Sequence, residues 1–248
     1  MKTITSTVAR MGALALVLLI GCAVPQPVSR LDPITDEANV KWSYGNQLIT
    51  LPEQDGLTVS TAFRASDPAN FMLEFSIRNA SNDPVLVTPE QFYYEALAAD
   101  TATVLAKIYA NDPEKTLLEM DLQESRLRAQ QQNETASELF AIAVDIADDA
   151  TDKNKTQEEQ NVEWAEQEAR RAEYESSKAN YALNFSSLND ERAYWANRTI
   201  RRSTVEPNYE LTGSVFFSRN NDARFIRVYF IVDNQIFTAT FRQVLHRP

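Results

Sequence analysis

The run Phe71-Met72-Leu73-Glu74-Phe75-Ser76-Ile77-Arg78 places a large apolar side chain at every second position. Successive side chains of a β-strand point to opposite faces, so Phe71, Leu73, Phe75 and Ile77 would share one face. Residues 57–63 alternate in the same way, and the turn residues Ser66-Asp67-Pro68 separate the two segments. The sequence therefore predicts two consecutive strands with one buried face.

The same β-type pattern continues after this run and returns near the end of the chain. Short strands are expected at 85–87, 92–94, 199–205, 211–217, 224–232 and 236–244, with Asn, Asp, Pro and Glu residues between them. In 224–232 the side chains of Ile226, Val228 and Phe230 are expected to face the core. About seven short antiparallel strands predict a β-sandwich formed by both halves of the chain.

Two motifs in these strands resemble the immunoglobulin-like domains of bacterial surface lipoproteins. The first is the run 75–87, in which Asn79, Ser81 and Pro84 follow an apolar strand. The second is Gly213-Ser214-Val215-Phe216-Phe217, which follows Pro207 and precedes a final hairpin. The resemblance covers about half of the chain after the signal and implies a fold that supports adhesion or interaction rather than catalysis.

A long polar segment, residues 111–198, interrupts the strands and has a helical pattern. Asn111-Asp112-Pro113-Glu114 is a typical helix start, with an Asx cap and a proline in the first turn. Thr156 and Glu159 form a possible capping box for a second helix after a loop at 148–155. The sequence thus predicts an antiparallel helical hairpin inserted into the sandwich, and the fold class is α+β.

Each predicted helix has residues spaced alternately three and four apart, and we expect these two seams to face each other. The first seam comprises positions 118, 122, 125, 129, 132, 136, 139, 143 and 146, and the second comprises Val162, Ala165, Ala169, Ala172, Ser176, Ala179 and Leu183. A local break is expected at 130–136, and a separate short helix carrying Tyr194 and Trp195 is expected from Asn189. Three arrangements stay open: a hairpin that projects into solvent, one that lies along a sheet, and one that is a docking surface.

The first 22 residues have the layout of an export signal. Lys2 and Arg10 precede an apolar run, 11–20, that is too short to span a membrane. Leu19-Ile20-Gly21-Cys22 resembles the lipobox of bacterial lipoproteins, which implies that the signal is cut before Cys22 and that this cysteine is lipidated. Ala23 after the cysteine implies sorting to the outer membrane. The alternative is an ordinary signal peptide with a chance cysteine.

The expected domain organisation follows from these signals. Residues 1–21 are the signal peptide, and 22–40 are the lipidated cysteine with a flexible tether that contains Pro25, Pro27 and Pro33. Residues 41–110 and 199–248 are the two parts of the sandwich, and 111–198 are the helical insertion. We expect 41–49, with Trp42 and Tyr44, to pack on the sandwich as a lead-in segment.

The charge balance argues against nucleic acid as a partner. The chain has 24 basic and 35 acidic side chains, and loss of Lys2 and Arg10 with the signal would leave a balance of −13. Affinity for a phosphate backbone comes from lysine and arginine, so an acidic surface disfavours it. Cys22 is the only cysteine, so the chain forms no internal disulfide.

Catalytic chemistry finds little support in the sequence. The only histidine is His246, near the chain end, and the five glycines form no phosphate-binding loop. No cluster of cysteine and histidine suggests zinc. Asp152 to Glu163 has a faint likeness to a calcium loop, but Gln157 stands where glycine is needed. We therefore expect no enzyme, no cofactor and no metal site.

Two functions remain, and both are binding functions. The first is a lipid-anchored protein of the bacterial cell envelope, in the periplasm or on the cell surface, that binds another envelope protein or copies of itself through the hairpin. The second is a sandwich that binds glycans or small ligands. Its surface aromatics would be Tyr93, Tyr94, Tyr194 and Trp195.

Overall fold

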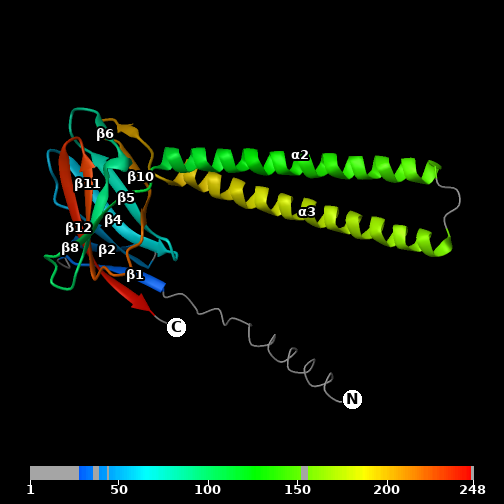
Figure 1. The fold of residues 1–248 in the computed structure, drawn as a ribbon. Helices are drawn as coiled ribbons and strands as arrows, with labels where there is room; N and C mark the ends of the chain where they lie inside the picture. The colour runs from blue at the N-terminus through cyan, green and yellow to red at the C-terminus, as the bar shows by residue number, and fades with distance from the viewer. Residues whose placement is uncertain (1–27, 36–38, 44, 152–155, 247–248) are drawn as a thin grey trace, which may run out of the picture.

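A computed structural model of the chain describes residues 28–35, 39–43, 45–151 and 156–246 (Figure 1). Two antiparallel sheets form a body, and two long helices extend from it, so the fold is α+β. The predicted signal peptide and Leu19, Ile20, Gly21 and Cys22 of the lipobox lie outside the described residues. None of the helices in the described part of the chain is both long enough and apolar enough to cross a membrane.

The first sheet has seven strands, four from the chain before the hairpin and three from the chain after it. Its main order is β1-β12-β11-β6-β9, and β7 pairs with both β11 and the edge strand β8. The strands are β1 Val28–Pro33, β6 Val85–Val87, β7 Tyr93–Leu97, β8 Val104–Tyr109, β9 Ser203–Val205, β11 Phe225–Val232 and β12 Gln235–His246. A single 3-10 turn, η3 Pro89–Gln91, joins β6 to β7.

The second sheet has five strands in the order β10-β5-β4-β3-β2. They are β2 Val40–Ser43, β3 Asn46–Thr50, β4 Leu57–Ser66, β5 Asn70–Asn79 and β10 Glu210–Ser218. Strand β5 contains the apolar run that predicted the fold, and it lies between β4 and β10 with all four of its predicted core side chains buried. This prediction is confirmed.

The two sheets share one core. Phe75 of the second sheet lies 5.1 Å from Phe230 of the first sheet and 5.1 Å from Phe92, measured between ring centroids. Ile226, Val228 and Phe230 of β11 are fully buried, as their alternation predicted. Strands from both ends of the chain therefore close a single apolar interior, as the sequence predicted.

The residues of the two motifs have structural roles at turns and crossings. Asn79 is fully buried, and its Nδ2 donates to the carbonyl oxygens of Asp83 at 2.8 Å and Val205 at 2.9 Å. Its Oδ1 accepts from the Ser81 amide at 2.9 Å. A Cβ at Gly213 would lie 2.8 Å from the Arg198 carbonyl oxygen, so glycine lets the chain pass close over β10. These residues therefore explain the fold rather than an activity.

Several predictions about the strands are wrong in their details. Val28–Pro33, expected within the flexible tether, is strand β1, which pairs with β12 along its whole length. The lead-in segment forms β2 and β3 at the edge of the second sheet. Strand β8 was not predicted, because its side chains at Val104, Leu105 and Tyr109 are exposed and show no one-sided apolar pattern.

The helical hairpin projects from the body (Figure 1). Helix α2 spans Pro113–Thr151, and helix α3 spans Gln157–Arg198. Both are continuous, so the predicted break at 130–136 and the predicted separate helix from Asn189 are wrong, and α2 extends into the predicted loop. The capping box of Thr156 and Glu159 is confirmed. At 1.5 Å per residue each helix is roughly 60 Å long.

Candidate interaction surface

The predicted seams of the hairpin face solvent. Every one of the sixteen seam positions is exposed, including Leu118 at 58% and Ile146 at 65%. The positions between the helices are instead offset by one or two residues toward the N-terminus on α2 and by one or two toward the C-terminus on α3. They begin with Leu117 and Met120 on α2 and include Tyr174, Tyr181 and Leu188 on α3. The apolar pattern that predicted the hairpin therefore marks its outside.

The interior of the hairpin is apolar only next to the body. Leu117 and Met120 of α2 form a buried cluster with Leu188 and Trp195 of α3. Phe216 of β10 stacks on Trp195, with ring centroids 4.6 Å apart. This cluster joins both helices to the second sheet.

Hydrogen bonds fix the two ends of the hairpin at the same strand, and an ion pair joins the two ends to each other. The Asn111 amide donates to the Phe216 carbonyl at 2.8 Å, and the Ile200 amide donates to the Ser214 carbonyl at 2.9 Å. Arg201 binds Glu114 through two hydrogen bonds of 2.5 and 2.8 Å. The hydrogen bond from Arg201 lowers the pKa of the Glu114 carboxyl. The base of the hairpin is thus held firmly on β10.

Farther from the body the two helices meet through polar side chains. The Arg192 guanidinium donates to Asp121 at 2.7 Å, and the Tyr181 hydroxyl donates to Glu134 at 2.6 Å. That bond raises the pKa of Tyr181. The hydroxyls of Thr135 and Tyr174 lie 3.3 Å apart. Such contacts set the pairing of the helices but bury little apolar area.

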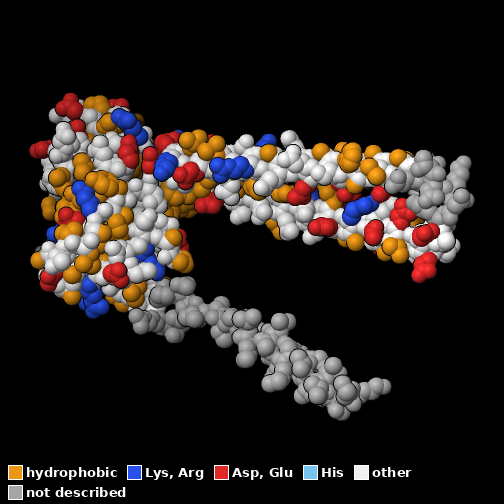
Figure 2. Space-filling model, in the orientation of Figure 1, with side chains coloured by type: hydrophobic (Ala, Val, Ile, Leu, Met, Phe, Trp, Pro, Cys, Tyr) orange, Lys and Arg blue, Asp and Glu red, His pale blue; other side chains and the backbone are white. Residues whose placement is uncertain are grey.

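Large apolar side chains cover the outside of the far half of the hairpin. Leu139, Phe140, Ile142, Val144 and Ile146 on α2 and Val162 and Trp164 on α3 are all exposed, with Trp164 at 74%. In Figure 2 hydrophobic side chains are prominent along α2 in this half, and acidic side chains along α3. Monomeric soluble proteins rarely expose so many large apolar side chains together, and such surfaces mark interaction sites.

The same half carries nearly all of the net charge of the chain. Residues 132–151 contain five acidic and no basic side chains, and residues 157–177 contain seven acidic and two basic ones, which gives −10. The near half, 113–131 and 178–198, contains six of each and is neutral. The far half of the hairpin is therefore both apolar and strongly negative.

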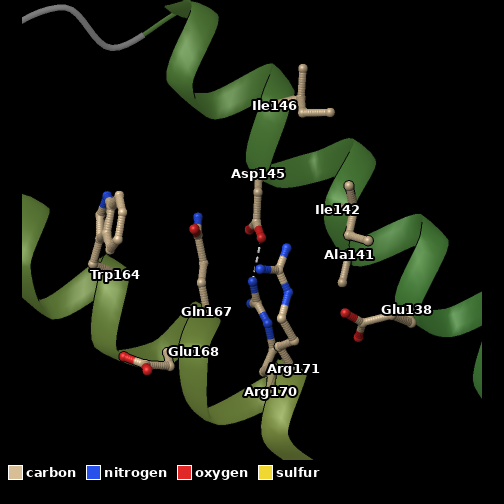
Figure 3. Close-up of a pocket in the computed structure, with 10 residues that line it drawn as sticks. All are labelled: Glu138, Ala141, Ile142, Asp145, Ile146, Trp164, Gln167, Glu168, Arg170 and Arg171. Carbon is tan, nitrogen blue, oxygen red and sulfur yellow. Dashed lines mark hydrogen bonds and ion pairs between the residues drawn. The ribbon is translucent and has the colours of Figure 1, made fainter. Parts of the chain in front are cut away.

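A groove of about 520 Å³ lies between α2 and α3 in this region (Figure 3). Trp164 belongs to its α3 side, and Ile142 and Ile146 belong to its α2 side. Asp145 and Arg170 form an ion pair across it. The groove thus combines apolar side chains with charged ones, of which Asp145 and Arg170 pair with each other.

The four aromatic residues predicted as one stacking surface lie in three places. Tyr94 is inside the core, where its hydroxyl donates to the Ser218 carbonyl at 2.8 Å and burial raises its pKa. Trp195 is buried at the hairpin base, and Tyr194 lies beside it with its hydroxyl 2.9 Å from the Met72 sulfur. Tyr93 is on the opposite face of β7 from Tyr94. These rings do not form a common platform.

Tyr93 belongs to an aromatic group on the outer face of the first sheet. It stacks on Tyr229 at 4.6 Å and lies 5.7 Å from Tyr109, and the Lys107 Nζ is 3.7 Å from its ring centroid. The Tyr229 hydroxyl donates to Glu95 at 2.8 Å. The Tyr229 ring and the Lys107 ammonium thus already contact the Tyr93 ring within the sheet, as is common for cross-strand pairs, whereas Tyr109 is 54% exposed.

The acidic residues do not gather into a metal site within the ranges that the structure covers. No group of three or more His, Cys, Asp or Glu side chains lies close enough there to hold an ion. The weak calcium-loop likeness at Asp152 to Glu163 falls partly on residues outside the described ranges.

Sequence reasoning missed the groove because it placed the apolar positions of the helices between them. The available signal was the interior pattern itself, in which Tyr174, Tyr181, Phe185 and Leu188 share one face of α3.

Comparisons of the chain with protein-family models, with curated proteins and with solved structures give no match.

Proposed function

We propose that this protein is a lipid-anchored component of the bacterial cell envelope whose helical hairpin is an arm that binds another protein. The body holds the arm in place, and no catalytic step is assigned to either part. The observation that carries the proposal is the exposed apolar surface on the far half of the hairpin, whose own interior is polar beyond its base. A surface of this kind gains free energy when a partner covers it.

The anchor proposed at Cys22 would keep the body close to a membrane. Only five residues lie between Cys22 and the start of β1 at Val28. Even fully extended, this link spans about 20 Å. In Figure 1 the N-terminal end of β1 and the base of the hairpin are on the same side of the body. The arm would therefore meet partners at or near the membrane surface.

We further propose that the two-sheet body is of the immunoglobulin-like type. The support is the shared core of two antiparallel sheets and the structural use of Asn79 and Gly213, the residues on which the resemblance rests. Such bodies serve as rigid platforms for interaction segments, which agrees with a hairpin fixed at both ends to β10.

Affinity purification from detergent-solubilised membranes tests the proposed arm. The full chain should recover a specific partner, and Leu139→Ser with Phe140→Ser should reduce that recovery at least about tenfold, since two exposed apolar contacts are lost. Trp42→Ser, which changes an equally exposed apolar residue on β2, is the matched control and should recover the partner normally. Recovery of monomer alone under several extraction conditions would contradict the proposal.

Membrane fractionation with metabolic lipid labelling tests the anchor separately. The chain should fractionate with membranes and carry the label, and Cys22→Ser should lose both properties. Retention of the label in the Cys22→Ser variant would remove the proposed anchor and leave the role of the hairpin to be judged by the first experiment.

A further inference from the structure

The groove near the far ends of α2 and α3 is long enough for a few turns of a helix and exposes large apolar side chains. Its α2 side runs from Glu138 to Ile146, nine residues or roughly 12 Å of helix. Trp164 closes the other side, and the exposed fractions of Ile142, Ile146 and Trp164 are 41, 65 and 74%. Two or three turns of a third helix would cover these side chains, as in other helix-in-groove complexes.

The polar groups inside the groove favour an occupant that places apolar side chains at the centre of the groove. Asp145 and Arg170 neutralise each other across the floor (Figure 3), so neither needs a charge from the occupant. Glu138 and Glu168 lie at its margins and form no ion pair with any residue in the described ranges. Arg171 also lines the groove, which therefore presents exposed apolar side chains with two carboxylates and one further guanidinium beside them.

The net charge of −10 on this half of the hairpin decides among the possible occupants. A second copy that brought its own groove to this surface would oppose one charge of −10 with another, and like charges in contact disfavour association. An anionic lipid surface would be repelled for the same reason. A basic occupant is attracted, and its attraction also speeds the encounter.

We propose that this groove binds a basic amphipathic helix of a partner protein, with the apolar face of that helix on Ile142, Ile146 and Trp164 and its lysine or arginine side chains beside Glu138 and Glu168. The inference rests on the proposed function and adds the chemistry of the partner. Because the surface is small, binding is transient, with a dissociation constant on the order of micromolar.

Three synthetic peptides of sixteen residues test this assignment. The first is an amphipathic lysine and leucine helix, the second replaces its lysines with glutamate, and the third replaces its leucines with serine. They are titrated into the full chain in nanodiscs of uncharged lipid, with empty nanodiscs as the blank. Trp42→Phe leaves Trp164 as the exposed fluorophore, since Trp195 is buried.

Only the lysine and leucine peptide should bind and shift the Trp164 emission to shorter wavelength. Ile142→Ser with Ile146→Ser should weaken its binding at least about tenfold. Leu118→Ser with Leu122→Ser, which changes exposed leucines on the near half of α2, should leave binding within about twofold. Glu138→Gln with Glu168→Gln should weaken binding and reduce its dependence on salt.

Each of the other outcomes overturns the inference. Equal binding of the glutamate peptide would show that charge does not select the occupant. Unchanged binding after Ile142→Ser with Ile146→Ser would place the site elsewhere. A concentration-dependent dimer that this double variant abolishes, seen by sedimentation, would assign the groove to a second copy. If recovery of the envelope partner depends on Leu139 and Phe140 but not on Ile142 and Ile146, the inference fails while the proposed function stands.

Discussion

The body and the hairpin differ in where their large apolar side chains lie. In the body, Phe75, Phe92 and Phe230 lie within about 5 Å of one another in a closed core. In the hairpin, the core ends after one cluster at the base, and the large apolar side chains of the far half lie outside. The body therefore stabilises itself, whereas the far half of the hairpin has surface left for another molecule.

This difference predicts a gradient of local stability along the hairpin. Exposed ion pairs such as Asp145 with Arg170 contribute at most about 1 kcal/mol each, and a typical hydrogen bond contributes a similar amount. Regions with few buried apolar contacts open locally without unfolding the whole protein. The base should thus be rigid and the far half the least stable part of the helices.

Replacing a ring in the body core should have the largest effect. Phe75→Ala removes a fully buried ring that contacts two others and leaves a cavity, which should lower the free energy of unfolding by about 3–5 kcal/mol. Chemical denaturation followed by circular dichroism measures this loss. Phe140→Ala, the same substitution on the exposed face of α2, should change it by less than about 0.5 kcal/mol. Similar losses for the two variants would contradict the contrast between the regions.

Trp195→Ala should have the next largest effect, centred on the hairpin base. It removes the indole that stacks on Phe216 and packs with Leu117, Met120 and Leu188, at a cost of about 3 kcal/mol. Hydrogen exchange should show faster exchange along α2 and α3 with smaller changes in β4 and β5. Trp164→Ala serves as the control, because this indole is exposed and its loss should leave exchange at the base unaltered. Faster exchange throughout the sheets would mean that the hairpin base is part of the body core.

The strands of the body were predictable because their burial is one-sided. Period-two alternation identified the buried faces of β5 and β11 directly, since each side chain of a strand faces either the core or the outside. Strand β8 lies at a sheet edge with exposed apolar residues, so its pattern carries no such signal. Strand β1 was mistaken for a tether because its pairing with β12 depends on a segment more than two hundred residues away.

The helix ends were also predictable, but the pairing of the helices was not. Asp112, Pro113 and the Thr156 and Glu159 capping box act locally, so the sequence alone identifies them. The seams were wrong because interior contacts such as Tyr181 with Glu134 are polar and long-range. An apolar stripe predicts which face of a helix is covered only when the cover lies within the same chain. On the far half of the hairpin the apolar side chains are exposed, so no part of the described chain provides such a cover there.

Removal of the cap of α3 tests the weakest part of the hairpin. Thr156→Ala deletes the hydroxyl that accepts from the Glu159 amide at 3.3 Å and should cost about 1 kcal/mol. Because the far half opens locally, hydrogen exchange of the first turns of α3 should accelerate while the denaturation midpoint of the body stays constant. Ser176→Ala, in the middle of the same helix, is the control and should not accelerate exchange there. A lowered midpoint for the body would show that the hairpin and the sheets unfold as one unit.

The smallest predicted effect is a pH dependence at the junction of the two regions. Arg201 lowers the pKa of Glu114 in the folded chain below its ordinary value of 4.5. The unfolded chain then binds the proton more tightly, so the contribution of this pair is present above that ordinary value and is lost as the pH falls through the folded pKa. Because the pair is exposed, the contribution is below about 1 kcal/mol.

Comparison of the unfolding free energies of the native chain and Glu114→Gln between pH 7 and pH 3 isolates this contribution. Protonation of the carboxylates on the far half of the hairpin relieves their mutual repulsion, which raises the free energy of unfolding as the pH falls. This contribution is common to both proteins and cancels in the difference. The difference should therefore be positive at pH 7 and shrink toward zero in acid. A difference that does not change with pH would mean that the charge of Glu114 contributes nothing to the stability of this pair.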